Sequence, residues 1–269
     1  LKKIRITGGE PLLRKNIDKL IYKLKEEVMI DNISITTNGS LLTENKISLL
    51  KESGLDSITL SLDTLDENKI SSINGTKKNI SFTPILENIE KYFNQIKTNT
   101  VVIKGINDNE VIDFVNLLAK FHAEIRFIEY MDVGESNKWD LDKVVSSASL
   151  REKISKHYNL VPIQTDCSST AKKWSIKNTK SSIGFISSIT EPFCADCNRA
   201  RLSVDGKLFT CLFASDGFDI KSLIRSDDYE KKLLDFFKDV WTERSDQYSQ
   251  IRFISKKEVP KVEMSYIGG

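Results

Sequence analysis

The sequence predicts an α/β protein: a parallel, barrel-like sheet with its helices over residues 1–132, followed by a smaller α+β region over residues 133–269. Three observations carry this prediction. Short β-branched runs alternate with longer amphipathic runs in the first half. Polar residues gather where the strands of that half end. Three closely spaced cysteines follow in the second half.

The first half alternates strands and helices in a regular order. Strands are expected where short β-branched runs occur, at 3–7, 33–36, 57–62, 98–103 and 124–129. Helices are expected where apolar residues recur three and four positions apart, at 17–28, 43–53, 66–72, 84–93 and 109–120. Thr43 is a typical helix cap and Gly54 a typical helix stop. This alternation implies right-handed βαβ units and therefore a parallel sheet.

Polar residues, with Met131 beside them, stand at or near the ends of these strands. They are Arg5, Thr7, Glu10, Thr36, Asn38, Ser61, Asp63, Asn99, Lys104 and Glu129. Any one of them alone is more often a cap or turn residue. In a parallel barrel, however, the C-terminal strand ends build the active site. Five successive strands that end in this way favour the mouth of a barrel.

The alternation stops after about residue 132. A helix is expected at 150–158, and short antiparallel strands at 173–176, 183–189, 201–204 and 208–212. Two helices, at 219–224 and 229–241, follow these strands. The chain therefore divides into a partial barrel, 1–132, and a C-terminal extension, 133–269.

The three cysteines of the extension have the spacing of a metal site. Cys194 and Cys197 can bind one metal from a single turn, and Asp205-Gly206 predicts a hairpin that returns Cys211. A structural zinc site closes with four ligands, whereas an iron-sulfur cluster with an open iron can bind a substrate. Iron-sulfur is favoured because no fourth ligand stands nearby. The alternatives are buried free cysteines, or zinc with a distant ligand from His122, His157 or Cys167.

Composition excludes several classes of protein. No apolar run is long enough to span a bilayer, and a net charge of +2 gives no global basic field for nucleic acid. Four cysteines without a secretory signal fit a reducing cytosol better than a disulfide framework. We therefore expect a cytoplasmic protein without membrane or nucleic-acid partners. The chain begins inside a strand-like segment at Leu1, so N-terminal sequence is expected to be missing.

An ordered set of motifs resembles a known family. Gly8-Gly9-Glu10-Pro11, directly after the first strand, resembles the radical S-adenosylmethionine (SAM) motif that holds the SAM amino group. The motifs that follow it are Thr36-Thr37-Asn38-Gly39, Ser61-Leu62-Asp63, the segment 126–132, the three cysteines, Asn198-Arg199-Ala200-Arg201 and the terminal Gly-Gly. Together they resemble the GTP 3′,8-cyclase (MoaA) family, which performs the first step of molybdenum cofactor synthesis. The resemblance covers essentially all 269 residues.

The resemblance implies an incomplete (β/α)6 barrel of the TIM type, here N-terminally truncated, with an α+β extension that carries a second cluster. In the family, an N-terminal [4Fe-4S] cluster cleaves SAM, and the resulting radical abstracts hydrogen from C3′ of GTP. Ring closure on C8 gives (8S)-3′,8-cyclo-7,8-dihydroguanosine 5′-triphosphate. The second [4Fe-4S] cluster, held here by Cys194, Cys197 and Cys211, would bind the purine through its open iron.

The resemblance also implies residue roles. The SAM-binding positions would be Gly9, Glu10, Ser61 and Met131. The GTP-binding positions would be Arg5, Thr36, Lys97, Arg199, Ala200 and Arg201. Gly268 and Gly269 would form an active-site tail, and no side chain is assigned as acid, base or nucleophile. Independently, Arg199 and Arg201 alternate along an expected strand, so both forks would face one way, and Arg forks suit phosphate.

The implied partners are GTP, SAM, an electron donor, a second copy of the chain, and cyclic pyranopterin monophosphate synthase as recipient of the product. One departure is serious, because the family's N-terminal Cys-x3-Cys-x2-Cys motif is absent from the sequence. The SAM-cleaving cluster is therefore expected only with a missing N-terminal segment, and the chain alone should be inactive. The rival readings are a radical SAM peptide-modifying enzyme with an auxiliary cluster, and a non-catalytic nucleotide-binding paralogue.

Overall fold

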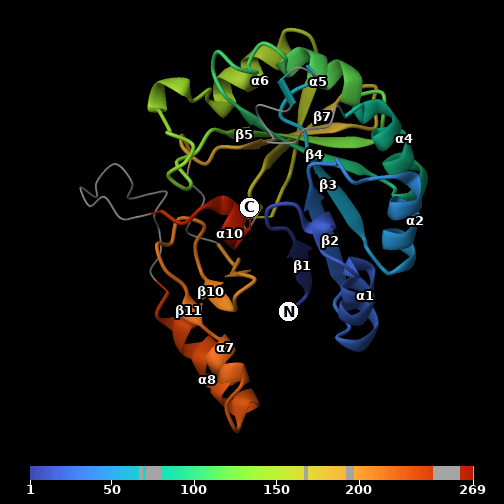
Figure 1. The fold of residues 1–269 in the computed structure, drawn as a ribbon. Helices are drawn as coiled ribbons and strands as arrows, with labels where there is room; N and C mark the ends of the chain where they lie inside the picture. Colours follow the sequence, from blue (N-terminus) through green and yellow to red (C-terminus); the bar gives the residue numbers. More distant parts are fainter. Residues whose placement is uncertain (67–68, 71–79, 167–168, 192–196, 245–260, 269) are drawn as a thin grey trace.

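A computed structural model of the chain describes residues 1–66, 69–70, 80–166, 169–191, 197–244 and 261–268 (Figure 1). Its main sheet has eight strands in the order β1-β2-β3-β4-β5-β8-β7-β6. Their bounds are β1 (Lys3–Ile6), β2 (Asn32–Thr37), β3 (Ser57–Ser61), β4 (Ile96–Val102), β5 (Ala123–Glu129), β6 (Leu160–Ile163), β7 (Lys172–Ile176) and β8 (Ser182–Ile186). Neighbouring strands from β1 through β5 to β8 are parallel, whereas β6 and β7 are antiparallel.

Helices cover the outer, convex face of this curved sheet (Figure 1). They are α1 (Ile17–Tyr22), continued by η2 (Lys23–Glu27), and then α2 (Glu44–Glu52), α4 (Phe82–Tyr92), α5 (Val111–Leu118) and α6 (Ser147–Ser155). Helix α2 begins where the sequence predicts, because the Thr43 hydroxyl accepts a hydrogen bond from the Lys46 backbone N–H at 3.2 Å. Most of the helix expected at 66–72 lies outside the described residues. No helix in the described ranges is long and apolar enough to cross a membrane.

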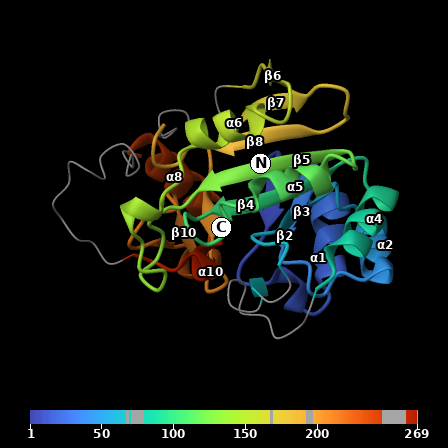
Figure 2. The same ribbon diagram turned by 90° about the horizontal axis from the view of Figure 1, so that it is seen from above.

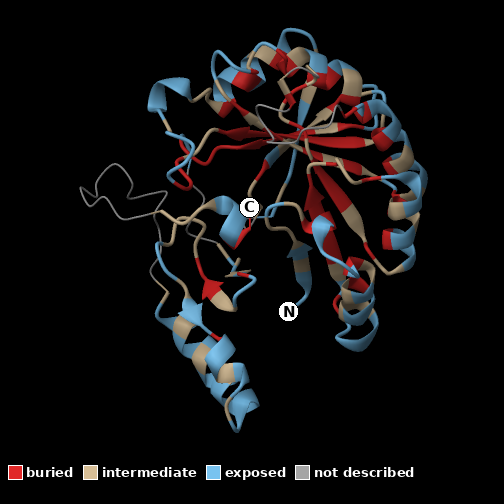
Figure 3. Ribbon diagram, viewed as in Figure 1, coloured by how far each residue is buried: buried red, intermediate tan, exposed pale blue. Residues whose placement is uncertain are grey.

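The two faces of the parallel strands differ in character. Apolar residues at alternate strand positions form the core together with helix residues. Buried residues are concentrated in the strands of the main sheet and recur along the helices that cover it (Figure 3). The strand residues of this core include Ile33, Ile35, Ile58, Leu60, Ile96, Ile125, Phe127, Ile183 and Phe185. A closed TIM barrel fills its interior with branched apolar side chains. Here the opposite face of the strands carries polar side chains, with a small apolar cluster of Ile128, Ala171 and Ile186 toward the strand ends. The concave side of the sheet is therefore suited to hold a ligand.

The strand register builds this polar face row by row. Thr36 of β2 pairs with Thr59 of β3, which pairs with Lys97 of β4, which pairs with Glu124 of β5. The next row toward the strand ends consists of Ser61, Asn99, Arg126 and Gly184. Side chains two residues apart on a strand share a face, so both rows line the same concave surface.

The structure corrects one expectation about the extension. Residues 183–189 were expected in an antiparallel strand, but β8 is parallel to β5 and antiparallel only to β7. The chain leaves β5, forms α6 and the β6–β7 hairpin, and then returns beside β5 in the same direction. This long crossover carries no local periodicity that would reveal it. The parallel sheet consequently continues past residue 132, the boundary inferred from the sequence.

The rest of the extension is a smaller unit. Strands β9 (Arg201–Leu202), β10 (Lys207–Phe209) and β11 (Phe218–Asp219) form an antiparallel sheet, followed by α7 (Lys221–Ile224) and α8 (Tyr229–Thr242). The expected hairpin around Asp205-Gly206 is confirmed, since β9 and β10 pair across it. The last helix, α10 (Met264–Ile267), lies beside β10 in both ribbon views (Figures 1 and 2).

A fully buried carboxylate fixes the end of β5. Glu129 is 0% exposed and accepts hydrogen bonds from the backbone N–H groups of Ser147, Ile189 and Thr190 at 2.8–2.9 Å. The Thr190 hydroxyl adds a fourth hydrogen bond at 2.6 Å. Glu129, which the sequence placed among strand-end polar residues, thus ties β5 to α6 and to the segment that follows β8.

Replacing Glu129 with alanine is expected to destabilise the fold by about 3 kcal/mol or more, because several buried donors lose their acceptor together. Glu129→Gln keeps one acceptor oxygen and should lose less. Denaturant unfolding measures both. Glu152→Ala, which removes an exposed partner of Lys156 on α6, is the matched control and should change stability by less than about 1 kcal/mol. Equal effects at Glu129 and Glu152 would contradict this role.

Candidate active site

The glycine loop after β1 is held by its own glutamate. The Glu10 carboxylate accepts hydrogen bonds from the Thr37 hydroxyl at 2.7 Å, the Asn38 N–H at 2.8 Å and the Leu12 N–H at 3.0 Å. These bonds fix the loop to the end of β2. A Cβ atom added at Gly8 or Gly9 would meet nothing within 4 Å. The loop backbone therefore faces open space that a ligand could enter.

Two further candidate SAM-binding residues lie at neighbouring strand ends. Ser61 ends β3 and pairs in register with Asn99 of β4. Met131 follows β5, is partly buried, and packs against Ile128 and Ile186. Nearby, Asp63 accepts a hydrogen bond from the Val101 N–H at 2.8 Å, and burial raises its pKa to about 6. The strand ends thus bring the SAM candidates to one edge of the sheet, although no measured contact joins them among the described residues.

Below this edge, the concave face gathers cations around one carboxylate. Arg126 Nε lies 3.6 Å and Lys173 Nζ 2.9 Å from the carboxylate oxygens of Glu124. Lys3 and Lys97 also interact electrostatically with this carboxylate. Burial lowers the pKa of Lys3 and of Lys97, and it lowers the pKa of Arg126 to about 10. We call Lys3, Arg5, Lys97, Arg126 and Lys173 the basic cluster; it holds more positive charge than Glu124 can balance.

The arginines of the extension meet this cluster. Burial is the main cause that lowers the pKa of Arg5, and the charge of Arg199 is the next. Burial followed by the charge of Arg199 also lowers the pKa of Arg201. Arg199 therefore lies close enough to repel both Arg5 and Arg201, although Arg5 is almost 200 positions away from it along the sequence.

Each of the two extension arginines also has a protein partner. Arg199 Nη2 donates to Cys197 Sγ at 3.1 Å, and Arg201 Nε donates to the Gly268 carbonyl at 3.1 Å. Strand β9 begins only at Arg201, so the expected alternation of both residues along one strand is wrong. Ala200, between them, is exposed.

Buried polar atoms without a partner also point to a ligand. The Thr36 hydroxyl and the Asn99 side-chain carbonyl are both buried without a hydrogen-bond partner. Both residues belong to the polar rows of the concave face. Because buried polar groups are nearly always hydrogen-bonded, a ligand on this face would supply the missing partners.

The described cysteines suit metal-binding thiolates. Cys197 and Cys211 are both partly buried, and the Phe213 N–H donates to Cys211 Sγ at 3.5 Å. Burial would raise the pKa of the Cys197 thiol, but hydrogen bonds and charge from Arg199 outweigh it and lower that pKa. Cys194 and Cys167 lie outside the described residues, within which no group of three metal-binding side chains occurs. The donors that can be examined fit a cluster.

The C-terminal tail is fastened at three points. The Glu263 carboxylate accepts hydrogen bonds from the N–H groups of Glu135 and Ser136 at 2.9 and 3.0 Å. The Tyr266 hydroxyl donates to Asp205 at 2.6 Å. Gly268 has a φ of +78°, and a Cβ atom there would lie 2.6 Å from the Thr7 methyl carbon. Only glycine therefore fits at this position. Gly269 lies outside the described residues.

Sequence reasoning missed part of the basic cluster as ligand-binding residues. Lys3, Glu124, Arg126 and Lys173 received no role, although the first three lie in expected strands of the parallel sheet. The sequence signal for such a residue is a charged side chain within an otherwise apolar strand, as in Ile125-Arg126-Phe127. Only the strand register shows that these charges share one face.

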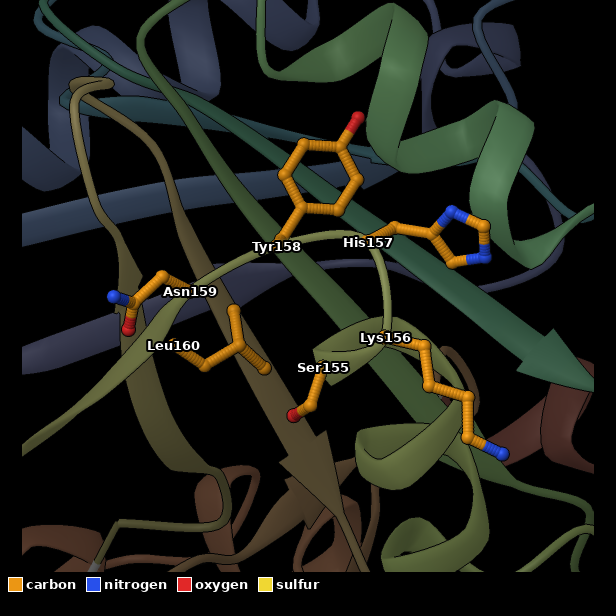
Figure 4. A pocket seen from close by; sticks show the side chains of 6 residues that line it. All are labelled: Ser155, Lys156, His157, Tyr158, Asn159 and Leu160. Carbon is orange, nitrogen blue, oxygen red and sulfur yellow. The ribbon is translucent and has the colours of Figure 1, made fainter.

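A hollow of about 410 Å³ lies elsewhere on the surface. It is lined by the connection from α6 to β6, residues Ser155 to Leu160 (Figure 4). Among them His157 was one possible distant metal ligand. The residues that line the hollow beside His157 include Lys156 and Tyr158 but no cysteine and no acidic residue. The hollow contains none of the candidate SAM, GTP or cluster residues.

The chain is similar to known proteins over its whole length. Residues 1–118 match the Radical SAM superfamily, and residues 123–250 match the Molybdenum Cofactor Synthesis C family. The GTP 3′,8-cyclase of Staphylococcus saprophyticus is 40% identical over 277 residues, with coverage of 100% of this chain and 81% of the relative. The GTP 3′,8-cyclase of Staphylococcus aureus strain Newman is 42% identical with the same coverage.

A solved structure agrees in fold. The Streptococcus suis protein SuiB, solved with S-adenosylmethionine bound, matches with a TM-score of 0.57 and 18% identity, and the match covers 93% of this chain and 56% of SuiB. At that identity the likeness shows the fold alone. The family follows from the sequence relatives: this chain belongs to the GTP 3′,8-cyclase family of radical SAM proteins.

Proposed function

We propose that this protein acts in the radical SAM cyclisation of GTP to (8S)-3′,8-cyclo-7,8-dihydroguanosine 5′-triphosphate, the first step of molybdenum cofactor biosynthesis. The observation that carries the proposal is the joining of three parts. Arg199 contacts Cys197 and lies near Arg5 of the basic cluster, and Arg201 lies beside Arg199 and contacts the Gly268 carbonyl. A polyanion bound there would meet the cysteine site and the tail together. A barrel with a purely structural role would not need these cations on its concave face.

The basic cluster is proposed to bind the triphosphate of GTP. A triphosphate carries about four negative charges, and Arg forks match phosphate oxygens. Arg5, Lys97, Arg199 and Arg201 are the contacts proposed from the family, and the geometry adds Lys3 and Arg126. Thr36 and the Ala200 backbone are proposed to orient the nucleoside, since the Thr36 hydroxyl is buried without a partner.

The glycine loop is proposed to receive the SAM amino group. Open space in front of Gly9 supports this role, and Ser61 and Met131 stand at strand ends of the same sheet. Glu10 already accepts three hydrogen bonds from the protein. Its main proposed role is therefore to fix the shape of the loop, and its second is to attract the SAM ammonium group.

The cysteine site is proposed to hold a [4Fe-4S] cluster through Cys194, Cys197 and Cys211. When bound, such a cluster supplies an open iron that can coordinate the purine. Arg199 would then lie between thiolate and nucleotide. SAM cleavage requires the separate N-terminal cluster of the family, and the Cys-x3-Cys-x2-Cys motif for it does not occur in these 269 residues. We therefore propose that this cluster is held by residues outside them.

Other parts of the proposal rest on the family alone. They are a functional division at residue 132, an electron donor, a homodimer, transfer of the product to cyclic pyranopterin monophosphate synthase, and a cytoplasmic location. The relatives at 40% and 42% identity are GTP 3′,8-cyclases, which favours GTP cyclisation over the peptide-modifying alternative.

Arg201→Ala is expected to weaken GTP binding by about 1.5–3 kcal/mol, roughly 10- to 150-fold in Kd, because a charge-assisted phosphate contact is lost. Arg225→Ala, at an exposed arginine that follows α7, is the matched control and should bind GTP normally. Isothermal calorimetry measures the affinity, and thermal melting checks the fold. Unchanged affinity in an Arg199→Ala/Arg201→Ala double variant would exclude the assignment.

As the pH is raised, polyphosphate binding is expected to weaken at a lower pH than it would at a site whose lysine has an ordinary pKa. Burial lowers the pKa of Lys97, so its ammonium loses its proton, and its attraction for phosphate, at a lower pH. Lys97→Arg keeps its charge and should extend tight binding to higher pH. Inorganic tripolyphosphate is the probe, and any change in its own charge affects both proteins equally, so the difference between the two profiles reports Lys97. Identical pH profiles for the two proteins would remove Lys97 from the phosphate site.

In an anaerobic assay with SAM, GTP and reductant, residues 1–269 alone are expected to release no 5′-deoxyadenosine. A version that carries an upstream Cys-x3-Cys-x2-Cys segment should form both 5′-deoxyadenosine and cyclised GTP. Removing Gly268-Gly269 from that version should leave its iron content intact but impair cyclisation. Sustained 5′-deoxyadenosine release by residues 1–269 would show that the radical-generating cluster has been assigned wrongly.

A further inference from the structure

A single arginine joins the two segments that carry the described cysteines. Arg244 lies just after α8 (Tyr229–Thr242). Its Nη1 donates to the Cys197 carbonyl at 2.7 Å, and its Nη2 donates to the Thr210 carbonyl at 2.7 Å. Thr210 directly precedes Cys211. One planar group therefore sets the separation between the segment before β9 and the segment after β10.

The geometry depends on arginine in particular. Both bonds come from the terminal nitrogens of one rigid fork, and an ammonium on a flexible chain cannot hold two carbonyls at a fixed separation in this way. The Trp241 ring lies 4.8 Å from Arg244 Cζ, so a cation–π contact from the last turn of α8 fixes the guanidinium further. Helix α8 thereby serves as the support for this fork.

The surroundings of the described cysteines are rich in positive charge. Arg199 donates to the Cys197 thiol, and the Arg244 guanidinium, bound to the Cys197 carbonyl, is a further cation that acts on that thiol. The positive charges of Arg199 and Arg244 both repel that of Arg201. Three guanidinium groups thus converge on the segments that carry two thiols. A cluster held by thiolates is anionic, and hydrogen bonds and cations beside such a cluster raise its reduction potential.

We propose that Arg244 is a positioning residue for the second cluster: it holds the Cys197 and Cys211 segments at ligating separation, and its charge stabilises the reduced cluster. The inference rests on the proposed function, because it assumes a cluster at these cysteines. It adds a residue beyond the three-cysteine motif, on an element whose sequence carries no ligand.

The test is anaerobic reconstitution with iron and sulfide, followed by iron analysis and redox titration monitored by electron paramagnetic resonance. The chain has four cysteines, three of them in this motif, so the iron signal reports one site. Wild-type protein should bind about four irons. Arg244→Ala should bind less than half as much, and its residual cluster should have a lower midpoint potential. Lys238→Ala, an exposed charge removal on α8, should match the wild type in both.

Arg244→Lys separates the fork from the charge. This variant should recover the midpoint potential, because it keeps the positive charge. It should not recover full iron loading, because it loses the pair of hydrogen bonds to the two carbonyls. It also preserves the fold if Arg244→Ala does not. Wild-type loading and potential in either Arg244→Ala or Arg244→Lys would overturn the inference. Failure of the wild-type chain to bind iron would instead overturn the proposed function, so the two failures are distinguishable.

Discussion

The burial of unbalanced positive charge on the concave face is the constraint on which the rest of the structure depends. Charges taken out of water are costly unless they are paired, and Glu124 is the carboxylate that faces the basic cluster in the described structure. The lowered pKa of Arg126 and of Lys97 expresses that cost. Stability must therefore come from the other face, where apolar strand residues pack under the helices. The fold carries the charge because an anionic ligand can return the lost interaction.

Three other acids near the sheet are held by local hydrogen bonds and ion pairs rather than by the basic cluster. Glu10 is held by three donors of the β1 and β2 ends, and Glu129 by four donors beyond β5. Glu110 accepts from Thr64 and Leu65 and pairs with Lys69. These carboxylates shape the strand ends and leave the cations to a ligand. Polar residues at strand ends therefore divide into a scaffold set and a ligand set, which the sequence alone does not separate.

The sequence predicts the parallel sheet well because period-two strands and period-3.6 helices alternate over residues 1–132. It fails at β8, since a parallel partner for β5 arrives after a crossover of more than fifty residues without a local signal. It identifies Arg199 and Arg201 from their motif but not their partners, Cys197 and Gly268. It misses Arg244, which has no motif at all. Long-range contacts of this kind depend on packing between separate elements, and local patterns do not record them.

Three arginines of the extension show how one side-chain type can serve both scaffold and ligand. A guanidinium has five donors, so it can bind the protein on one edge and a ligand on another. Arg201 uses Nε for the Gly268 carbonyl, whereas a phosphate needs only the two terminal nitrogens. Arg199 reaches a thiol from one terminal nitrogen, and Arg244 uses both of its terminal nitrogens for carbonyls. Arg201, which binds the protein through Nε, is thus suited to substrate, and Arg244, which binds two carbonyls through its terminal nitrogens, is suited to the frame that holds the cysteines.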